Sequence, residues 1–229
     1  MRFLAVLFDA AGTLIAPAEP VGETYSRLAR EHGVALSAAR IDDAFRRVFA
    51  SAPPNVHPGE TRARAAELER TWWRARVRET FLAADGSARF RDFEAYFAAL
   101  WEHFARGAAW RTRPGATEAL GDLRASGRRL AIVSNFDQRL DPILRELGLR
   151  ACFEHVVLPV DCGAAKPERA IFDACLARLA LPARACVYVG DHARLDALAA
   201  HAAGLTPIDV AELATLATLP DRIAALETT

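Results

Sequence analysis

The chain has 229 residues, 52% of them hydrophobic and 25% charged, which is enough for one large domain or a domain with a sizeable insertion. Lys plus Arg and Asp plus Glu both number 29, so the formal net charge is zero. Proteins that bind duplex nucleic acid or anionic membranes carry a basic excess, and we therefore expect neither partner. No apolar run approaches the roughly 18 residues of a membrane span.

The first apolar run, residues 3–8, is too short for a signal peptide and ends in Asp9 rather than at a small-residue cleavage site. We interpret it as a strand buried on both faces of a parallel sheet. The cysteines form no CxxC pair and have no histidine at zinc-like spacing, which indicates reduced thiols in a cytoplasmic protein. They are Cys152, Cys162, Cys175 and Cys186.

Residues 23–110 are expected to be helical, because apolar residues recur there at spacings of three and four. A loop is expected at 51–59, which is rich in Pro, Asn and Gly. After Arg113-Pro114-Gly115 the pattern changes to short apolar runs that alternate with helical stretches. The predicted strands are 130–133, 156–160, 186–189 and 206–210, and the predicted helices are near 116–126, 139–147, 168–180 and 193–203.

Strands that alternate with helices predict an α/β fold with a Rossmann-like parallel sheet. We expect a core domain made of residues 1–15 plus 111–229. An all-helical cap domain, residues 16–110, is inserted after the first strand.

Chemically active residues follow each predicted strand. In an open parallel sheet, ligands bind at the carboxyl ends of the strands, so these residues are expected to meet at one edge. Lys166 stands out among them, because it is the only Lys of the chain and all the other Lys and Arg positions are Arg. A lone Lys suits a position that needs a compact ammonium. The residues are Asp9 and Thr13, Ser134 and Asn135, Lys166, and Asp191 and Asp196.

These residues lie in four segments, DAAGTL at 9–14, VSN at 133–135, KP at 166–167 and GDHARLD at 190–196. Their order and spacing resemble the four motifs of the haloacid dehalogenase superfamily of hydrolases, including a helical cap after the first motif. The finer pattern of Trp72-Trp73, SNFD and GAAKP resembles one branch of that superfamily.

The resemblance implies a phosphatase that acts on a small phosphorylated metabolite. Asp9 matches the nucleophile that forms an aspartyl-phosphate, Ser134 the hydroxyl that binds the transferring group, and Lys166 the ammonium that neutralises charge. Thr13 and Asn135 belong to the same phosphate-binding set. Mg²⁺ is the implied cofactor, held by Asp9, the backbone carbonyl of residue 11, Asp191 and Asp196.

One position departs from the phosphatase pattern. The second Asp of the first motif, which protonates the leaving alkoxide and then activates water, is replaced by Ala11. General acid–base help of this kind is typically worth about 10²–10⁴ in rate, so slow turnover is expected. A substrate with a good leaving group would need this help less. Another residue, with His192 as the candidate, could supply the proton, or the chain has lost the activity.

Three other interpretations remain to be weighed. Phosphonoacetaldehyde hydrolases carry Ala at this position but need a cap lysine, and this cap has none. Metal-independent L-2-haloacid dehalogenases have a similar first motif, and the many cap arginines could bind halide, although Asp191 and Asp196 argue against them. A catalytically degenerate protein that binds a phosphorylated ligand or a partner is the third.

Two structural interpretations compete with roles in the site. Asp196 could simply stabilise a helix N-terminus, and we give this interpretation about the same weight as a role in binding metal. The four tryptophans are more typical of the cap core or the interface between cap and core than of a substrate site, although exposed aromatic residues of a cap could still line an entrance. They are Trp72, Trp73, Trp101 and Trp110. Oligomeric state, monomer or homodimer, stays open.

Overall fold

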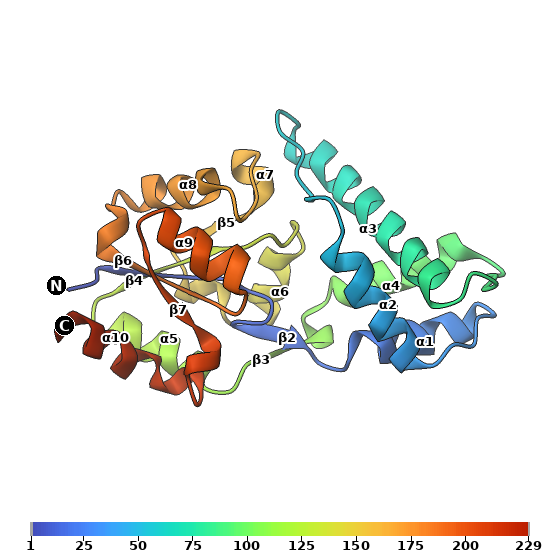
Figure 1. The fold of residues 1–229 in the computed structure, drawn as a ribbon, viewed down its shortest axis with the longest axis horizontal. Helices are drawn as coiled ribbons and strands as arrows, with labels where there is room; N and C mark the ends of the chain where they lie inside the picture. The colour runs from blue at the N-terminus through green and yellow to red at the C-terminus, as the bar shows by residue number, and fades with distance from the viewer. Residues whose placement is uncertain (1, 229) are drawn as a thin grey trace.

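The computed structural model describes residues 2–228, which form a sheet-containing unit and a helical unit side by side (Figure 1). Within these residues the larger sheet has five parallel strands in the order β5-β4-β1-β6-β7, which confirms the predicted α/β fold. The strands are β1 Ala5–Phe8, β4 Arg129–Val133, β5 His155–Val157, β6 Cys186–Gly190 and β7 Thr206–Asp209.

The central strand β1 is buried on both faces, as its uninterrupted apolar sequence predicts. Its side chains alternate between two cores. Val6 and Phe8 pack into the core under α5, α6 and α10, while Ala5 and Leu7 pack into the core under α8 and α9. These helices are α5 Ala116–Ala125, α6 Leu140–Glu146, α8 Arg169–Leu179, α9 Ala199–Ala202 and α10 Leu219–Thr228.

The helical unit has its own apolar core. Tyr25, Phe81 and Tyr96 from three different helices meet there with their rings edge to face. Ser37, Thr61 and Asp92 accept backbone N–H bonds at three of the helix N-termini, as short polar side chains do at N-caps. The helices are α1 Val21–Glu31, α2 Ala38–Ala50, α3 Arg62–Ala84 and α4 Phe93–Phe104.

Two short antiparallel strands, β2 Ile15–Pro17 and β3 Trp110–Thr112, connect the two units. Neither strand was predicted from the sequence, although the domain boundaries predicted at 15/16 and 110/111 lie within them. Each of these strands has only three residues, which is too short for a period-two pattern to stand out. The pair brings both chain crossings together, so that the cap is attached at one place (Figure 1).

The structure departs from the predicted elements in three places. The strand expected at 156–160 ends at Val157, because Pro159 begins the short helix α7, Pro159–Cys162. The helix expected at 193–203 starts as a π-helical turn, Ala193–Leu198. The C-terminal helix α10 was not predicted. Short 3₁₀ turns lie at Gly107–Ala109, Arg150–Cys152, Ala183–Ala185, Val210–Glu212 and Leu216–Thr218.

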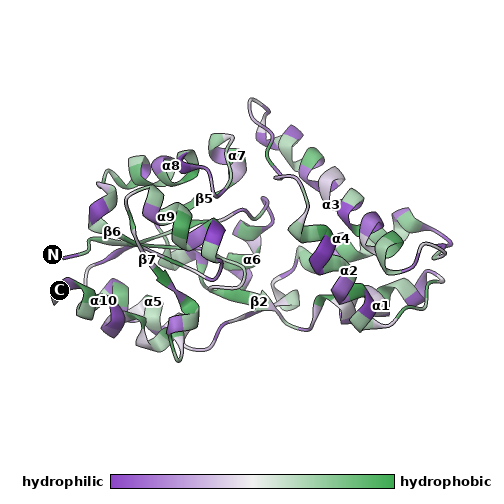
Figure 2. Cartoon of the chain, viewed as in Figure 1, coloured by the Kyte–Doolittle hydropathy of each residue, from purple (hydrophilic) through white to green (hydrophobic). Residues whose placement is uncertain are grey.

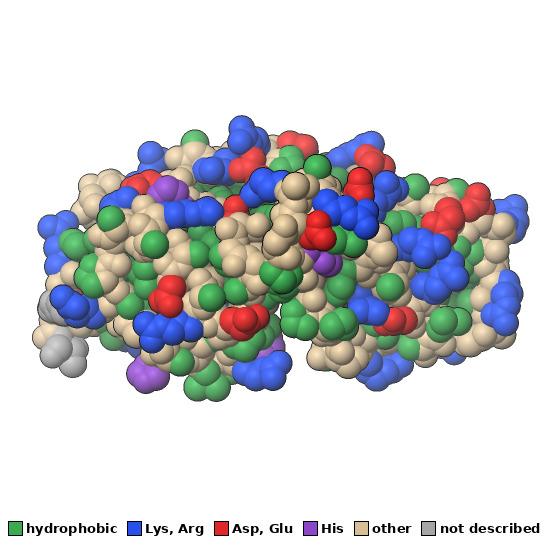
Figure 3. Space-filling view, turned by 90° about the horizontal axis from the view of Figure 1, so that it is seen from above, with side chains coloured by type: hydrophobic (Ala, Val, Ile, Leu, Met, Phe, Trp, Pro, Cys, Tyr) green, Lys and Arg blue, Asp and Glu red, His purple; other side chains and the backbone are tan. Residues whose placement is uncertain are grey.

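Apolar residues gather in the sheet and on the inward faces of the helices, while hydrophilic residues lie on the outer faces (Figure 2). Basic and acidic side chains are interspersed over both units on the face seen in Figure 3. Within residues 2–228, no helix is both long and apolar enough to cross a membrane.

Candidate active site

The carboxyl ends of three neighbouring strands supply most of the predicted site. Asp9 follows β1, Ser134 follows β4 and Asp191 follows β6, and these strands are adjacent in the sheet. Lys166 reaches the same edge from the loop between α7 and α8. All four residues line one cavity of about 380 Å³ between the sheet and the cap. The structure thus brings the predicted residues together as the α/β topology requires.

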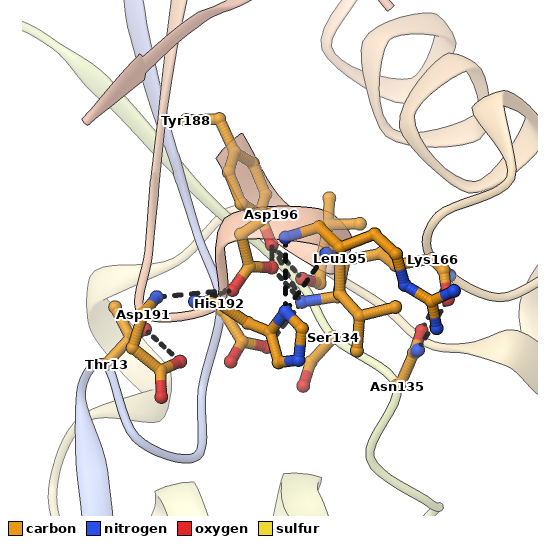
Figure 4. A network of polar contacts seen from close by, with 12 residues as sticks. Thr13, Ser134, Asn135, Lys166, Tyr188, Asp191, His192, Leu195 and Asp196 are labelled. Carbon is orange, nitrogen blue, oxygen red and sulfur yellow. Dashed lines mark hydrogen bonds and ion pairs between the residues drawn. The ribbon is translucent and has the colours of Figure 1, made fainter. Parts of the chain in front are cut away.

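The ammonium of Lys166 lies at the centre of this edge (Figure 4). Its Nζ donates to Asp9 Oδ1 at 2.8 Å, to Asp196 Oδ1 at 2.6 Å and to the Tyr188 hydroxyl at 2.9 Å. These are three acceptors for the three protons of an ammonium. Burial lowers the pKa of Lys166, but the carboxylates of Asp9 and Asp196 outweigh this effect and raise it above the usual value. The group is therefore a fixed positive charge beside Asp9.

Tyr188 is a site residue that the sequence analysis missed. It lies in the fully buried strand β6, and its hydroxyl is within 3.0 Å of both the Val133 carbonyl and Asp196 Oδ1. Burial raises its pKa well above the usual value, so the phenol stays neutral. A signal was present in the sequence, because the hydroxyl of a tyrosine in an otherwise apolar buried strand needs a polar partner.

Asn135 holds the loop that carries the lysine. Its Oδ1 accepts the backbone N–H of Lys166 at 2.7 Å, and its Nδ2 donates to the Lys166 carbonyl at 2.8 Å. The following peptide bond, to Pro167, is cis. Because both polar atoms of the amide are used in this way, Asn135 positions Lys166, although it also lines the cavity.

The carboxylates of Asp9, Asp191 and Asp196 form the acidic part of the site. One oxygen from each lies within 4.8 Å of the others, which is a grouping that could hold a metal ion. Burial, followed by the nearby Asp9 and Asp196, raises the pKa of Asp191, while a hydrogen bond from the Thr13 hydroxyl opposes this rise. An oxygen ligand set with unbalanced negative charge suits a hard divalent cation.

Asp196 differs from the other two carboxylates in its partners. Its Oδ2 accepts the backbone N–H groups of Asp191 at 3.2 Å and of His192 at 3.0 Å. Its Oδ1 accepts from Lys166, and the Tyr188 hydroxyl lies at 3.0 Å. A carboxylate has about four lone-pair positions, and these neighbours fill or reach all of them. Asp191, in contrast, accepts one side-chain hydrogen bond, from Thr13.

Two glycines allow the acidic residues to approach the strand ends. Gly12 has φ +94°, a left-handed conformation, and a Cβ built there would overlap the Asp191 carboxylate. A Cβ on Gly190 would overlap the side chain of Asp196. The sequence motifs therefore contain glycine where the backbone passes directly beside a carboxylate.

Ser134 and His192 face the same cavity. Ser134 is buried, and its Oγ accepts a weak bond from the Phe136 N–H at 3.4 Å, which leaves the hydroxyl proton for another acceptor. His192 accepts the backbone N–H groups of Arg194 and Leu195 on Nδ1, each at 3.2 Å. In the neutral ring the proton is therefore on Nε2.

Ala11 lines the cavity without contributing a polar side chain. Among the described residues of the cavity wall, the carboxylates are those of Asp9, Asp191 and Asp196. No further acid stands near Ala11 to replace the missing second Asp, so that His192 is the remaining candidate within this wall.

The cap side of the cavity is apolar and rich in aromatic rings. The tryptophans were expected mainly in the cap core or the interface, and Trp73 and Trp101 do pack there. Nevertheless, Trp73, Trp101 and Trp110 also line the cavity, whereas Trp72 does not. A single tryptophan can serve both roles because its ring is large enough to contact the core and the cavity at the same time.

The cavity wall contains one described arginine, Arg139, and it comes from the core rather than from the cap. Asp137 binds its guanidinium through two hydrogen bonds of 2.8 and 2.6 Å. The ring of Trp101 covers it at 3.7 Å. The plentiful cap arginines, which the sequence analysis considered as a halide site, do not line this cavity within residues 2–228.

The model of the haloacid dehalogenase-like hydrolases matches residues 3–204. The chain belongs to this family of hydrolases. It is 34% identical over 203 residues to haloacid dehalogenase-like hydrolase domain-containing protein 3 of Danio rerio, in a match that covers 87% of this chain and 81% of that protein. Identity to the Homo sapiens protein of the same name is 30%, covering 90% and 80%. The resemblance to one branch of the family is thus confirmed.

Solved structures give the same fold. A HAD phosphatase from Thermococcus onnurineus aligns with a TM-score of 0.63 at 22% identity, over 97% of this chain and 98% of that one. The L-2-haloacid dehalogenase from Xanthobacter autotrophicus aligns with a TM-score of 0.67 at 20% identity, over 97% and 83%. The shared fold thus hosts both phosphate and carbon–halogen chemistry, and the choice between them depends on the site.

Proposed function

We propose that this hydrolase is a Mg²⁺-dependent phosphatase of a small phosphorylated metabolite, acting through an aspartyl-phosphate on Asp9. The observation that carries the proposal is the buried ammonium of Lys166, 2.8 Å from Asp9 Oδ1, beside a cluster of carboxylates. Charge neutralisation and positioning are the main requirements of phosphoryl transfer. A fixed cation and a candidate metal site next to one carboxylate supply both.

In the proposed reaction Asp9 attacks phosphorus with Oδ2, since Lys166 holds Oδ1. The bond between phosphorus and the ester oxygen breaks, and the electron pair leaves on the alcohol oxygen. Water then attacks the phosphorus of the aspartyl-phosphate, releasing inorganic phosphate and restoring the carboxylate. Ser134 donates a hydrogen bond to a phosphoryl oxygen, and Lys166 stabilises the charge that develops on these oxygens.

Asp9, Asp191 and the backbone carbonyl of Ala11 would hold Mg²⁺, with Thr13 orienting Asp191. The ion would neutralise phosphoryl oxygens when bound. Asp196 was predicted as a further ligand, and that prediction stands untested. Because its lone pairs already have partners, we assign it the role of positioning Lys166 and the 191–192 backbone.

Because Ala11 replaces the second Asp, the leaving oxygen lacks the usual carboxyl that would protonate it, so we expect slow turnover. His192 is the proposed hydrogen-bond donor to the leaving oxygen, because its Nε2 carries the proton and the residue lines the cavity. The substrate is expected to be a small molecule, and the four free thiols among the described residues are in keeping with the cytoplasm.

The experiment measures phosphate and alcohol release from an activated aryl phosphate, with and without Mg²⁺. Turnover is expected only with the metal, and Asp9→Asn should abolish it. Asp173→Asn, which removes an exposed carboxylate paired with Arg169, is the matched control and should retain full activity. Turnover retained by the Asp9→Asn variant would contradict the proposal.

A 2-haloacid assay under the same conditions tests the dehalogenase alternative. Halide release that is insensitive to a chelator would establish that alternative. The absence of both reactions, together with binding of a phosphorylated ligand, would identify a catalytically degenerate binding protein.

A further inference from the structure

The cap contributes only apolar or aromatic side chains to the cavity, within the described residues. Most of them are aromatic, including Tyr25, Phe45, Trp73 and Trp101. Burial raises the pKa of Tyr25 far above the usual value, so this phenol also stays uncharged. The half of the cavity away from Lys166 therefore offers a substrate dispersion contacts and burial rather than charge.

Several of these rings are stacked into one wall. Phe45 and Phe49 are stacked with ring centroids 5.4 Å apart, and Phe49 and Trp73 are stacked at 5.7 Å. The interplanar angles are 15° and 22°, so the three rings lie nearly parallel. All three line the cavity. Because Phe49 is stacked between Phe45 and Trp73, this wall offers ring edges, and the face of a flat ring packs favourably against such edges.

Among the described residues, the cavity also lacks a free cation for a second anionic group. Apart from Lys166, the basic groups of the described wall are Arg139 and His192. Asp137 neutralises Arg139 through two hydrogen bonds, and Trp101 covers the face of its guanidinium. His192 uses Nδ1 to accept the backbone N–H groups of Arg194 and Leu195. A bisphosphate, a phosphorylated carboxylic acid or a sugar phosphate would leave polar groups unpaired in this half of the cavity.

We infer that the substrate is a phosphate monoester of an aromatic alcohol or phenol. This inference rests on the phosphatase function proposed above and names its substrate class. The phosphate lies between Lys166 and Ser134, and the ring lies against the wall of Phe45, Phe49 and Trp73. The volume of about 380 Å³ is near the lower end of ligand pockets, which suits one or two rings with a phosphate.

The phenol esters of this class also account for Ala11. A phenol has a pKa of about 10, so it leaves as a phenoxide more readily than an alkoxide does and depends less on a general acid. Attack by Asp9 breaks the bond between phosphorus and oxygen, the electron pair stays on the phenolate oxygen, and solvent supplies the proton. The aromatic wall and the missing acid are separate features that point to the same kind of ester.

The test compares kcat/KM for benzyl phosphate, methyl phosphate and glucose 6-phosphate. Benzyl and methyl alcohol are leaving groups of similar basicity, so their ratio reports burial of the ring rather than leaving-group chemistry. Burial of a ring predicts that benzyl phosphate exceeds methyl phosphate by at least about 10-fold. Phosphonate inhibitors give a second readout on the unaltered protein, with benzylphosphonate expected to bind more tightly than methylphosphonate.

Phe45→Ala is expected to lower the benzyl-to-methyl ratio several-fold, because it removes part of the wall. Leu82→Ala, an exposed cap residue outside the cavity, is the matched control and should keep the ratio. Equal kcat/KM for benzyl and methyl phosphate, or a preference for glucose 6-phosphate, would overturn the substrate class while leaving the phosphatase intact. The absence of Asp9-dependent turnover with every ester would overturn the phosphatase proposal, and the substrate class with it.

Discussion

At the scale of single residues, Ala11 decides how fast the proposed reaction runs. The side chain lines the cavity next to Asp9, so an introduced carboxyl would face the leaving oxygen. We expect Ala11→Asp to raise phosphatase kcat by about 10-fold or more, toward the 10²–10⁴ typical of general acid–base help. The measurement is steady-state turnover of benzyl phosphate, whose leaving group needs a proton. Ala11→Asn, which cannot transfer a proton in this way, is the control, and an equal gain with Asn would refute the explanation.

Lys166 is expected to matter for stability as well as for chemistry. Its ammonium separates the buried carboxylates of Asp9 and Asp196, which would otherwise face each other without a counter-charge. Breaking a buried ion pair by removing one partner costs about 3–5 kcal/mol, so Lys166→Met should lower the free energy of unfolding by about that amount. Urea denaturation of the variant and of the unaltered protein measures this difference in the free energy of unfolding. Arg169→Met, in an exposed pair, should cost at most about 1 kcal/mol.

At the scale of elements, helix α3 and the loop after β4 form a contact between cap and core. Trp73 Nε1 donates to Asp137 Oδ2 at 2.7 Å, and Glu69 Oε2 accepts from the backbone N–H and the side chain of Gln138 at 3.3 and 3.2 Å. Glu69 is only 4% exposed. Burial, then the nearby Asp137, raises its pKa, while bonds from Gln138 and the charge of Arg139 lower it.

This raised pKa predicts a pH dependence. A carboxyl whose pKa is higher in the folded than in the unfolded chain stabilises the fold fully below its unfolded value of 4.5, and this contribution is lost as the pH rises through the folded value. Glu69→Gln stays neutral and should gain stability relative to the unaltered chain across that window. Urea midpoints at several pH values measure the difference. Glu67→Gln, an exposed neighbour on α3, should show no such trend.

The elements that position the site residues could be predicted, because their local sequence patterns agree with the fold. The strand before Asp9 is an uninterrupted apolar run, and Asp9, Ser134 and Asp191 follow their strands directly. The elements that were missed have weaker signals. Strands β2 and β3 are three residues long and form through pairing across the chain, and the π-helical turn at 193–198 contains Asp196, whose bonds with Lys166 and Tyr188 are tertiary.

At the scale of the whole molecule, the residues that line the cavity on the cap side could not be predicted from the sequence. The cap aromatic residues could be seen in the sequence, but their spacing is the same for a helical core as for a cavity wall. Only the packing of the cap against the sheet separates Trp73, which lines the cavity, from its neighbour Trp72, which does not. Likewise, the neutralisation of Arg139 by Asp137 depends on side-chain geometry.

The proposed function and the proposed substrate class both require that Asp9 becomes covalently phosphorylated in the cavity between cap and core. The most direct measurement mixes the protein with phenyl phosphate and Mg²⁺, quenches with acid during the first turnover, and locates the phosphoryl group by mass spectrometry of the peptide containing residue 9. We predict a burst of phenol equal to the enzyme concentration and phosphate on Asp9, with neither in Asp9→Asn. Phenol release without a phosphoryl group on Asp9, or a phosphoryl group on another residue, would contradict the proposed mechanism.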